Sequence, residues 1–173
     1  MNDPPTSALR AARERVVREH IASEERGDFD ATVATFHRPR YEVTPTGETF
    51  DGAAAVRAFL DESGRAFPGF TFETHAMHHA DDAVIVETTF HGTHRGPWRG
   101  LPATGREVAY RMANVFVFED DRLVCERLHF DRLTILQQLG IARDPTTLAG
   151  RVGVFFNHPI TTLRAFLGAL TRR

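Results

Sequence analysis

Two long stretches of alternating apolar and polar residues, separated by a loop, constrain the fold of this 173-residue chain more than any other feature. They run from 83 to 94 and from 106 to 118. Alternation with a period of two is typical of a β-strand that buries one of its faces. The intervening residues 95–105 contain three glycines and two prolines, which favour a loop. The sequence therefore predicts two long strands joined by an irregular segment.

Before residue 70 the apolar residues recur at helical rather than strand spacing. Three helices are expected, over 7–26, 28–36 and 51–63. Each begins at a residue whose side chain can accept hydrogen bonds from free backbone N–H groups: Thr6 or Ser7, Asp28 and Asp51.

Further strands are expected at 41–43, 70–77 and 123–130, followed by a short helix at 133–139 that Asp131 can cap. Helices first and consecutive antiparallel strands afterwards predict the α+β class. We expect one domain over 1–140 and a C-terminal extension over 141–173.

The extension has apolar residues on one face of a predicted amphipathic helix, namely Leu163, Phe166, Leu167 and Leu170. Its polar positions are Arg164, Arg172 and Arg173. We expect this helix to pack on the body or on a partner subunit. A helix on a membrane surface is the alternative, which the short length and weak charge of the segment disfavour.

Composition narrows the functional classes. The net charge is -2, so no basic surplus indicates a nucleic-acid partner. All 21 basic residues are arginine, which excludes Schiff-base chemistry on a lysine and a phosphate-loop lysine. A single cysteine, Cys125, leaves no internal disulfide and favours a cytoplasmic location. The apolar runs are too short to span a bilayer and no signal peptide is evident, so no membrane partner is expected.

One face of the strand at 106–118 has the composition of a small-molecule pocket. Its residues are Val108, Tyr110, Met112, Asn114, Phe116 and Phe118. Apolar walls with a few polar groups are typical of ligand pockets, although a core face with satisfied polar groups fits equally well. Trp98, in the loop, could cover such a pocket or pack at a subunit interface.

Glu126 shares one face of the strand at 123–130 with Leu128 and Phe130. Burial would raise the pKa of this carboxyl group and make Glu126 a candidate general base or acid. The alternative is an ion pair with Arg111 or Arg127. Asp131 is a second candidate carboxylate, with a helix cap as its alternative role.

Nine histidines raise the question of a metal site. Glu87 and His91 share a strand face, but four strand residues span about 13 Å, too far for one ion. His94 and His129 are instead interpreted as ligand-binding residues, with a surface or interface position as the alternative for His129. We predict no metal and no cofactor.

Three motifs carry a resemblance to a known family: Gly92-Thr93-His94, Pro102-Ala103-Thr104-Gly105-Arg106 and Gln138-Leu139-Gly140. Through them residues 10–140 resemble the SnoaL-like polyketide and ester cyclases, within the nuclear transport factor two-like superfamily. The resemblance implies a cone, in which a curved antiparallel sheet wraps around the N-terminal helices, and a homodimer. It also implies an intramolecular aldol cyclisation without metal or cofactor, served by an Asp and a His in the pocket.

The chain departs from the family at both of those positions. With Leu123 and Asp131 as fixed points, the family's histidine falls on Asn114 and its aspartate on Leu128. We therefore expect Glu126 or Asp131 to act as base, with Asn114 and Tyr110 orienting a carbonyl or enolate oxygen. The expected reaction is a cyclisation, isomerisation or hydration of a small apolar carbonyl compound. A non-catalytic binding protein and a structural dimer module are the alternatives.

Overall fold

The computed structural model describes residues 6–144 and 146–170, except for the side chains of 165–167, 169 and 170. The α+β prediction is confirmed. The elements, in chain order, are α1 (Ser7–Glu25), α2 (Phe29–Ala34), β1 (Arg40–Val43), β2 (Glu48–Asp51), α3 (Ala53–Ala66), β3 (Thr71–His79), β4 (Ala83–Thr93), β5 (Glu107–Glu119), β6 (Arg122–Phe130), α4 (Arg132–Gln138), α5 (Leu148–Asn157) and α6 (Pro159–Leu170).

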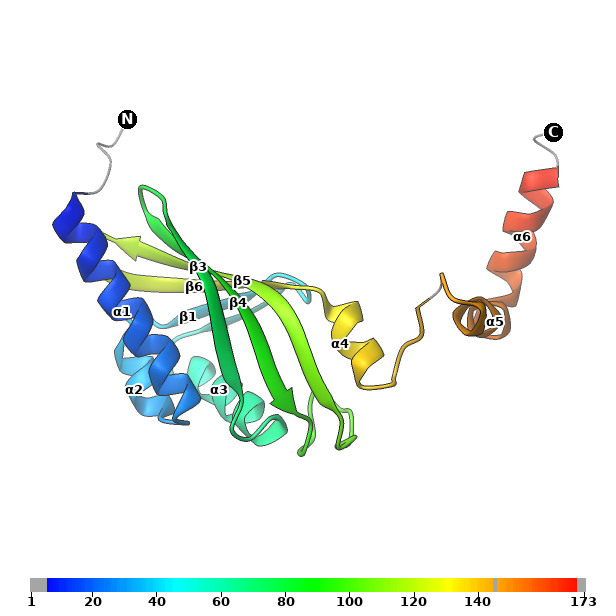
Figure 1. Ribbon diagram of the computed structural model, residues 1–173, viewed down its shortest axis with the longest axis horizontal. Coiled ribbons are helices and arrows are strands. Elements are labelled where there is room, and N and C mark those ends of the chain that lie inside the picture. The colour runs from blue at the N-terminus through cyan, green and yellow to red at the C-terminus, as the bar shows by residue number, and fades with distance from the viewer. Residues whose placement is uncertain (1–5, 145, 171–173) are drawn as a thin grey trace.

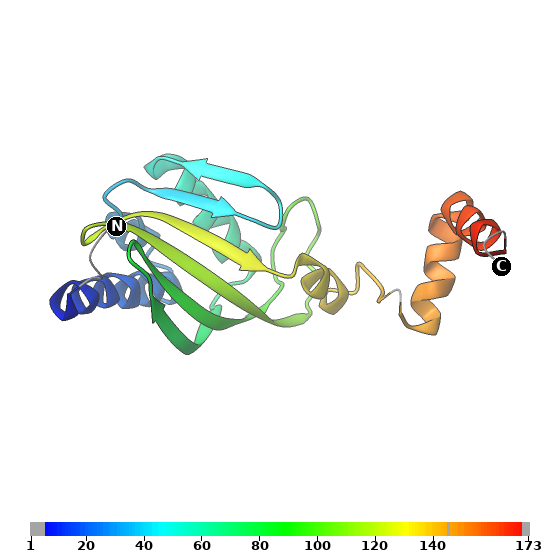
Figure 2. The same ribbon diagram turned by 90° about the horizontal axis from the view of Figure 1, so that it is seen from above.

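The six strands form one curved sheet in the order β2-β1-β6-β5-β4-β3. All neighbours pair antiparallel except β1 and β6, which are parallel. Figures 1 and 2 show α1, α2 and α3 together on one side of the curved sheet, as the predicted cone requires. This arrangement encloses the space between the helices and the concave face of the sheet.

The first two helices begin at the predicted caps. The Thr6 hydroxyl accepts a hydrogen bond from the N–H of Leu9 at 3.2 Å. The Asp28 carboxylate accepts one from the N–H of Ala31 at 3.1 Å. Both side chains satisfy backbone donors that the first turn of a helix leaves free.

The prediction for Asp51 was wrong. This residue ends β2, an edge strand paired with β1, and Gly52 is the residue before α3, without a side-chain cap. Gly52 has φ 86°, a left-handed conformation that glycine adopts without strain. The sequence does not predict β2, because four strand residues after a glycine are too few to show a clear alternation.

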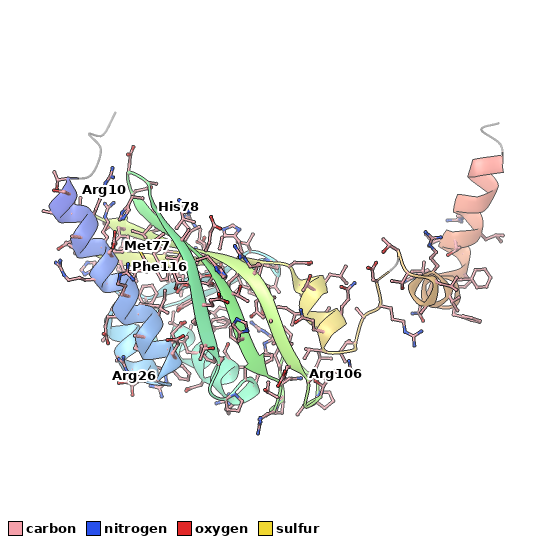
Figure 3. All side chains as sticks on the ribbon, in the orientation of Figure 1. Arg10, Arg26, Met77, His78, Arg106 and Phe116 are labelled. Atoms are coloured by element: carbon pink, nitrogen blue, oxygen red, sulfur yellow. The ribbon has the colours of Figure 1, made fainter. Side chains whose placement is uncertain are left out.

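The predicted inward face of β5 is confirmed as the face buried beneath the helices. Val108, Met112, Asn114, Phe116 and Phe118 are all buried, and their neighbours along the strand are half-buried or exposed. Phe116 lies at the centre, with no exposed surface, and Figure 3 shows it in the part of the sheet next to α1. These side chains pack with apolar residues of α1 and α3 in the main hydrophobic core.

The C-terminal extension forms two helices rather than the single one expected. α5 ends at Asn157 and α6 begins at Pro159, a residue that favours the first turn of a helix. Figures 1 and 2 show both helices apart from the body, beyond a linker that follows α4. Packing of the extension on a partner subunit stays a prediction. The side chains of Phe166, Leu167 and Leu170, and all of Arg172 and Arg173, lie outside the described part.

Candidate functional site

A cavity of about 90 Å³ lies between the helices and the concave face of the sheet. Its walls are mostly apolar and aromatic; they include Phe59, Leu60, Phe67, Phe70, Phe90 and Met112. A fully packed core leaves few voids larger than one water molecule, whereas this cavity has room for several water molecules. The polar groups in the cavity are therefore the candidates for chemistry.

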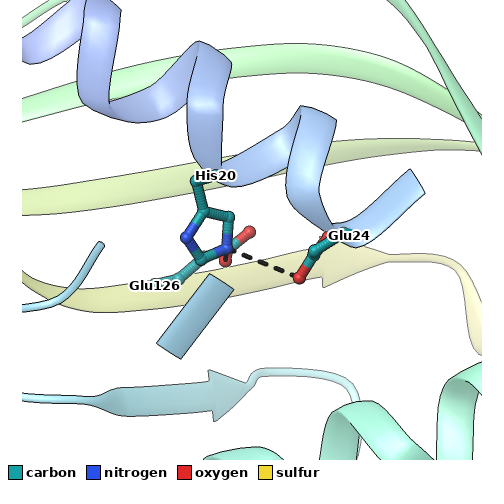
Figure 4. A group of neighbouring side chains, drawn as sticks. All are labelled: His20, Glu24 and Glu126. Atoms are coloured by element: carbon teal, nitrogen blue, oxygen red, sulfur yellow. Dashed lines mark ion pairs between the residues drawn. The ribbon is translucent and has the colours of Figure 1, made fainter. Parts of the chain in front are cut away.

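Four buried polar side chains meet at one end of the cavity; three of them, Glu24, Tyr41 and Glu126, line it, and His20 contacts them from behind. His20 and Glu24 come from α1, Tyr41 from β1 and Glu126 from β6, and each is at most 6% exposed. The Tyr41 hydroxyl lies 2.6 Å from Glu24 Oε1 and 2.7 Å from His20 Nε2. His20 Nε2 also lies 3.0 Å from Glu126 Oε2 and 3.4 Å from Glu24 Oε1. Figure 4 shows His20 above the strand that carries Glu126, with Glu24 one turn further along α1. These four residues are called the buried network below.

Local structure explains why the four groups meet. His20 and Glu24 are four residues apart, which places them on the same face of α1. Tyr41 and Glu126 are direct partners in the parallel pairing of β1 with β6. Glu126 is also the partner of Phe116 on β5, so its side chain points toward α1 with the core residues.

The hydrogen bonds define the protonation state of His20. The Thr35 hydroxyl donates to the carbonyl oxygen of Thr32 at 2.7 Å, so it accepts from His20 Nδ1, also at 2.7 Å. The Tyr41 hydroxyl donates to Glu24, so it accepts from His20 Nε2. Both ring nitrogens therefore carry protons, and His20 is an imidazolium ion.

The electrostatics agree with this assignment. Burial lowers the pKa of His20, but Glu126 and Glu24 outweigh it and raise this pKa to about 9. Burial raises the pKa of Glu126, and the charge on His20 offsets only part of that rise. Glu126 Oε2 is buried and lies 3.0 Å from His20 Nε2 as an ion pair, while the Nε2 hydrogen bond goes to the Tyr41 hydroxyl. The raised pKa means that Glu126 accepts a proton more readily than an exposed glutamate.

Two further polar side chains line the same cavity. Asn114 is 2% exposed, and its Oδ1 has no hydrogen-bond partner in the part of the chain described. Burial raises the pKa of Tyr110 well above its ordinary value, so its hydroxyl stays protonated and can donate. Asn114 is paired with Leu128 across the β5–β6 ladder, two residues from Glu126 on the same face.

The structure places Asp131 outside the cavity wall. Its carboxylate is exposed and caps α4, accepting hydrogen bonds from the Leu133 N–H at 2.8 Å and the Thr134 hydroxyl at 2.6 Å. The Thr134 hydroxyl, with help from backbone N–H groups, lowers the pKa of Asp131. This geometry corresponds to the capping role weighed for it above.

The expected ligand-binding residues divide into two groups. Met112, Tyr110 and Trp98 line the cavity. His94 is buried behind it, stacked on Phe67 with ring centroids 5.2 Å apart, and burial lowers its pKa.

His129 does not contribute to the site. His129 is exposed on β6, and its side chain points to the face of the sheet opposite to that of Leu128, which lines the cavity.

The loop at 95–105 holds Trp98 against α3. The N–H groups of Arg95 and Gly96 both donate to the carbonyl oxygen of Ala66, at 2.8 and 3.2 Å. A Cβ atom at Gly96 would lie 2.2 Å from the Arg65 carbonyl oxygen, so only glycine allows this approach. The loop therefore forms a fixed part of the cavity wall.

The arginines weighed as partners of Glu126 pair elsewhere. Arg111 contacts Glu87 at 3.4 Å and Arg127 contacts Glu42 at 2.8 Å, on the outer face of the sheet. The ion pair of Glu126 is formed with His20 instead.

His20, Glu24 and Glu126 also offer ligand atoms within 4.8 Å of one another, as a metal site would require. Metal binding needs a free lone pair on the imidazole. Both nitrogens of His20 donate hydrogen bonds, and the Tyr41 hydroxyl that accepts from Nε2 also donates to Glu24. The hydrogen-bonded network therefore fits a protonated histidine better than a metal ligand.

Sequence reasoning identified Glu126 and Asn114 but missed His20, Glu24 and Tyr41. A signal was present: His20 and Glu24 lie on the apolar face of α1, next to Val17 and Ile21. Two ionisable residues four apart on an apolar helix face indicate a buried pair. The partner of that pair could not be read from the sequence, because β1 and β6 are far apart along the chain.

Comparison with solved structures defines the class of fold. TsrD from Streptomyces laurentii is 23% identical, with a TM-score of 0.67 over 76% of this chain and 97% of that one. A protein from Jannaschia sp. CCS1, named as a candidate SnoaL-like polyketide cyclase, is 18% identical, with a TM-score of 0.69 over 82% and 100%. An NTF2-like protein from Burkholderia thailandensis E264 is 26% identical, with a TM-score of 0.61 over 73% and 96%. The chain thus has the nuclear transport factor two-like fold.

The family model of the SnoaL-like polyketide cyclases matches residues 14–139. The chain belongs to this family, as the sequence motifs indicated. Among curated proteins, none matches the chain.

Proposed function

We propose that the chain catalyses cofactor-independent acid/base chemistry on a small apolar carbonyl compound, with Glu126 as the general base. The observation that carries this proposal is the buried Glu126 carboxylate at the cavity wall, with a raised pKa and the imidazolium of His20 beside it. A carboxylate whose pKa is raised toward neutrality is better suited to proton abstraction at physiological pH.

The charge balance of the buried network supports this role. The imidazolium of His20 is shared by two buried carboxylates, Glu24 and Glu126, which leaves one excess negative charge. Uptake of a substrate proton by Glu126 moves that excess charge from the buried network to the carbonyl oxygen of the substrate. The transfer therefore relieves the repulsion between Glu126 and Glu24, while the enolate that forms needs hydrogen-bond donors of its own.

The chemical step is an enolisation. Glu126 takes a proton from the carbon next to the substrate carbonyl, and the C–H electron pair moves to the carbonyl oxygen. Asn114, through its Nδ2, and Tyr110, through its hydroxyl group, are the donors for that oxygen, because both side chains line the cavity. Return of the proton at another position, or attack of the enolate on a second carbonyl, gives an isomerisation or a ring closure.

The test separates an enzyme from a binding protein. Apolar ketones are screened for binding through the fluorescence of Trp98, the single tryptophan, which lines the cavity. Products are measured by mass spectrometry for the wild type and for Glu126→Gln. We expect Glu126→Gln to bind the same ketones and to turn over at least about 100-fold more slowly.

The control is Glu42→Gln, since Glu42 is a carboxylate on the outer face of the sheet, paired with Arg127. Its turnover should equal that of the wild type. Binding by all three proteins without turnover by any would contradict the enzyme proposal and support a non-catalytic binding protein of the same fold.

A further inference from the structure

A second surface lies away from the cavity, on the two C-terminal helices. Within the described residues nine large hydrophobic side chains are exposed, and seven of them belong to α5 and α6. These seven form the C-terminal apolar surface: Leu148, Val152, Val154, Phe155, Phe156, Ile160 and Leu163. Soluble monomers rarely leave so many large apolar groups together in water. We therefore expect an apolar partner to cover these side chains.

On α5 the exposed apolar residues follow the helical repeat. Leu148, Val152 and Phe155 are four and three residues apart, and Phe156 lies one turn after Val152. Phe155 and Phe156 are 53% and 75% exposed. Gly150 is the buried residue of α5, and the rest of the helix is exposed or half-buried. The apolar face of α5 is therefore open to solvent.

The charge of this segment has a single sign. No Asp or Glu follows Asp144, whereas four of the 21 arginines do, so residues 145–173 carry a formal charge of +4. The remaining 17 arginines and all 23 acidic residues leave residues 1–144 at -6. Arg151 and Arg164 are the arginines of α5 and α6, and both are exposed. The surface is apolar and basic, and a complementary partner is apolar and acidic.

Copies of this chain do not offer such a partner. Two C-terminal apolar surfaces placed face to face would bring the arginines of both copies together without any acid to neutralise them. Before α5, the exposed large apolar side chains that the structure describes are Leu133 and Ile141 alone. Neither the extension nor the body of a second copy therefore provides an apolar and acidic surface.

We propose that α5 and α6 bind the surface of a membrane that contains anionic lipids. The acyl region covers the apolar residues, and the headgroups pair with the arginines. With 10 and 12 residues the helices lie in the interface, and no described helix is long and apolar enough to cross a bilayer. This proposal takes up the membrane-surface helix that the short length and weak charge of the segment disfavoured, and it replaces the expectation that the chain has no membrane partner.

The test is cosedimentation of the full chain with lipid vesicles. One set contains phosphatidylcholine alone, and the other contains phosphatidylcholine mixed with phosphatidylglycerol. We expect binding to the mixed vesicles and at least tenfold weaker binding to phosphatidylcholine alone. Added salt should weaken the binding to the mixed vesicles, because it screens the attraction between the arginines and the anionic headgroups. Absence of binding to the mixed vesicles, or equal binding to both sets, would overturn the proposal.

Three variants locate the binding surface. Phe155→Ser with Phe156→Ser should weaken binding to the mixed vesicles at least tenfold. Arg151→Gln with Arg164→Gln should reduce the preference for anionic vesicles by about fivefold per arginine. Leu133→Ser, on the body, should bind like the wild type. Light scattering measures the oligomeric state of the wild type and of the Phe155→Ser, Phe156→Ser variant. A wild-type dimer that becomes a monomer in this variant would assign the surface to a second copy and overturn the proposal.

Discussion

At the scale of single residues, the site depends on where polar groups are buried. His20, Glu24 and Glu126 are excluded from water, and each has an ionic partner in one of the others. Asn114 has no hydrogen-bond partner for its buried Oδ1 in the described structure, a cost of about 1 to 3 kcal/mol that stability alone would select against. We infer that Asn114 is kept for contact with a ligand.

The substitution Asn114→Leu separates a role of Asn114 in stability from a role in contact with a ligand. Leucine has a similar size and removes the unpartnered acceptor, so we expect the free energy of unfolding to stay unchanged or to rise by about 1 kcal/mol. Turnover should fall by roughly 100-fold to 1,000-fold, because a donor to the developing oxyanion is lost. Thermal unfolding and the ketone assay measure the two effects. A clear loss of stability would indicate a structural asparagine.

The protonated His20 predicts how stability varies with pH. Its pKa is raised from 6.5 in the unfolded chain to about 9 in the folded one, so its stabilisation is complete below pH 6.5 and is lost as the pH rises to about 9. The free energy of unfolding should fall across this window by at most about 3 kcal/mol. Chemical denaturation at several pH values measures it.

The matched variants are His20→Gln, which should flatten this dependence, and His129→Gln, an exposed histidine, which should keep it. Parallel curves for wild type and His20→Gln would show that another group titrates in the window.

At the scale of elements, α1 is the part of the fold that completes the site. It carries His20 and Glu24, while Arg13 fixes its N-terminal half to the sheet. The Arg13 guanidinium donates to the carbonyl oxygens of Asp120 at 2.7 Å and Asp81 at 2.9 Å, in two turns between strands. The position of the buried network therefore depends on a contact far from the cavity.

Arg13→Ala should destabilise the protein by about 3 kcal/mol, because two hydrogen bonds from a charged donor are lost and Arg13 is only 3% exposed. Arg10→Ala, on the exposed side of the same helix, should change stability by less than about 0.5 kcal/mol. Thermal unfolding compares them. Equal effects would mean that the contacts of Arg13 do not hold α1 in place.

The sequence predicted most elements because their periodicity is strong and local. The alternation along β4 and β5 and the caps Thr6 and Asp28 are signals within a few residues. The edge strand β2 was missed because it is only four residues long. The buried network was missed for a different reason: its members come from α1, β1 and β6, and only the fold brings them together.

At the scale of the whole molecule, the chain has two parts with different surfaces. The body encloses the cavity, and the extension after Asp144 exposes apolar and basic residues. Figure 1 shows the extension away from the body. The stability of the body should therefore not depend on it.

Truncation after Asp144 tests this separation. We expect the shortened chain to keep the Tm of the full chain within about 2 °C, because the extension covers little of the core. Differential scanning calorimetry compares the two. A drop of about 10 °C or more would show that the extension packs on the body in solution.

The central claim is that Glu126 abstracts a proton from a carbonyl compound bound in the cavity. The most direct measurement is incorporation of deuterium next to the carbonyl group when apolar ketones that bind the protein are incubated with it in D2O. We predict incorporation with the wild type and with Glu42→Gln, and a loss of at least about 100-fold with Glu126→Gln. Equal incorporation by wild type and Glu126→Gln would contradict the claim.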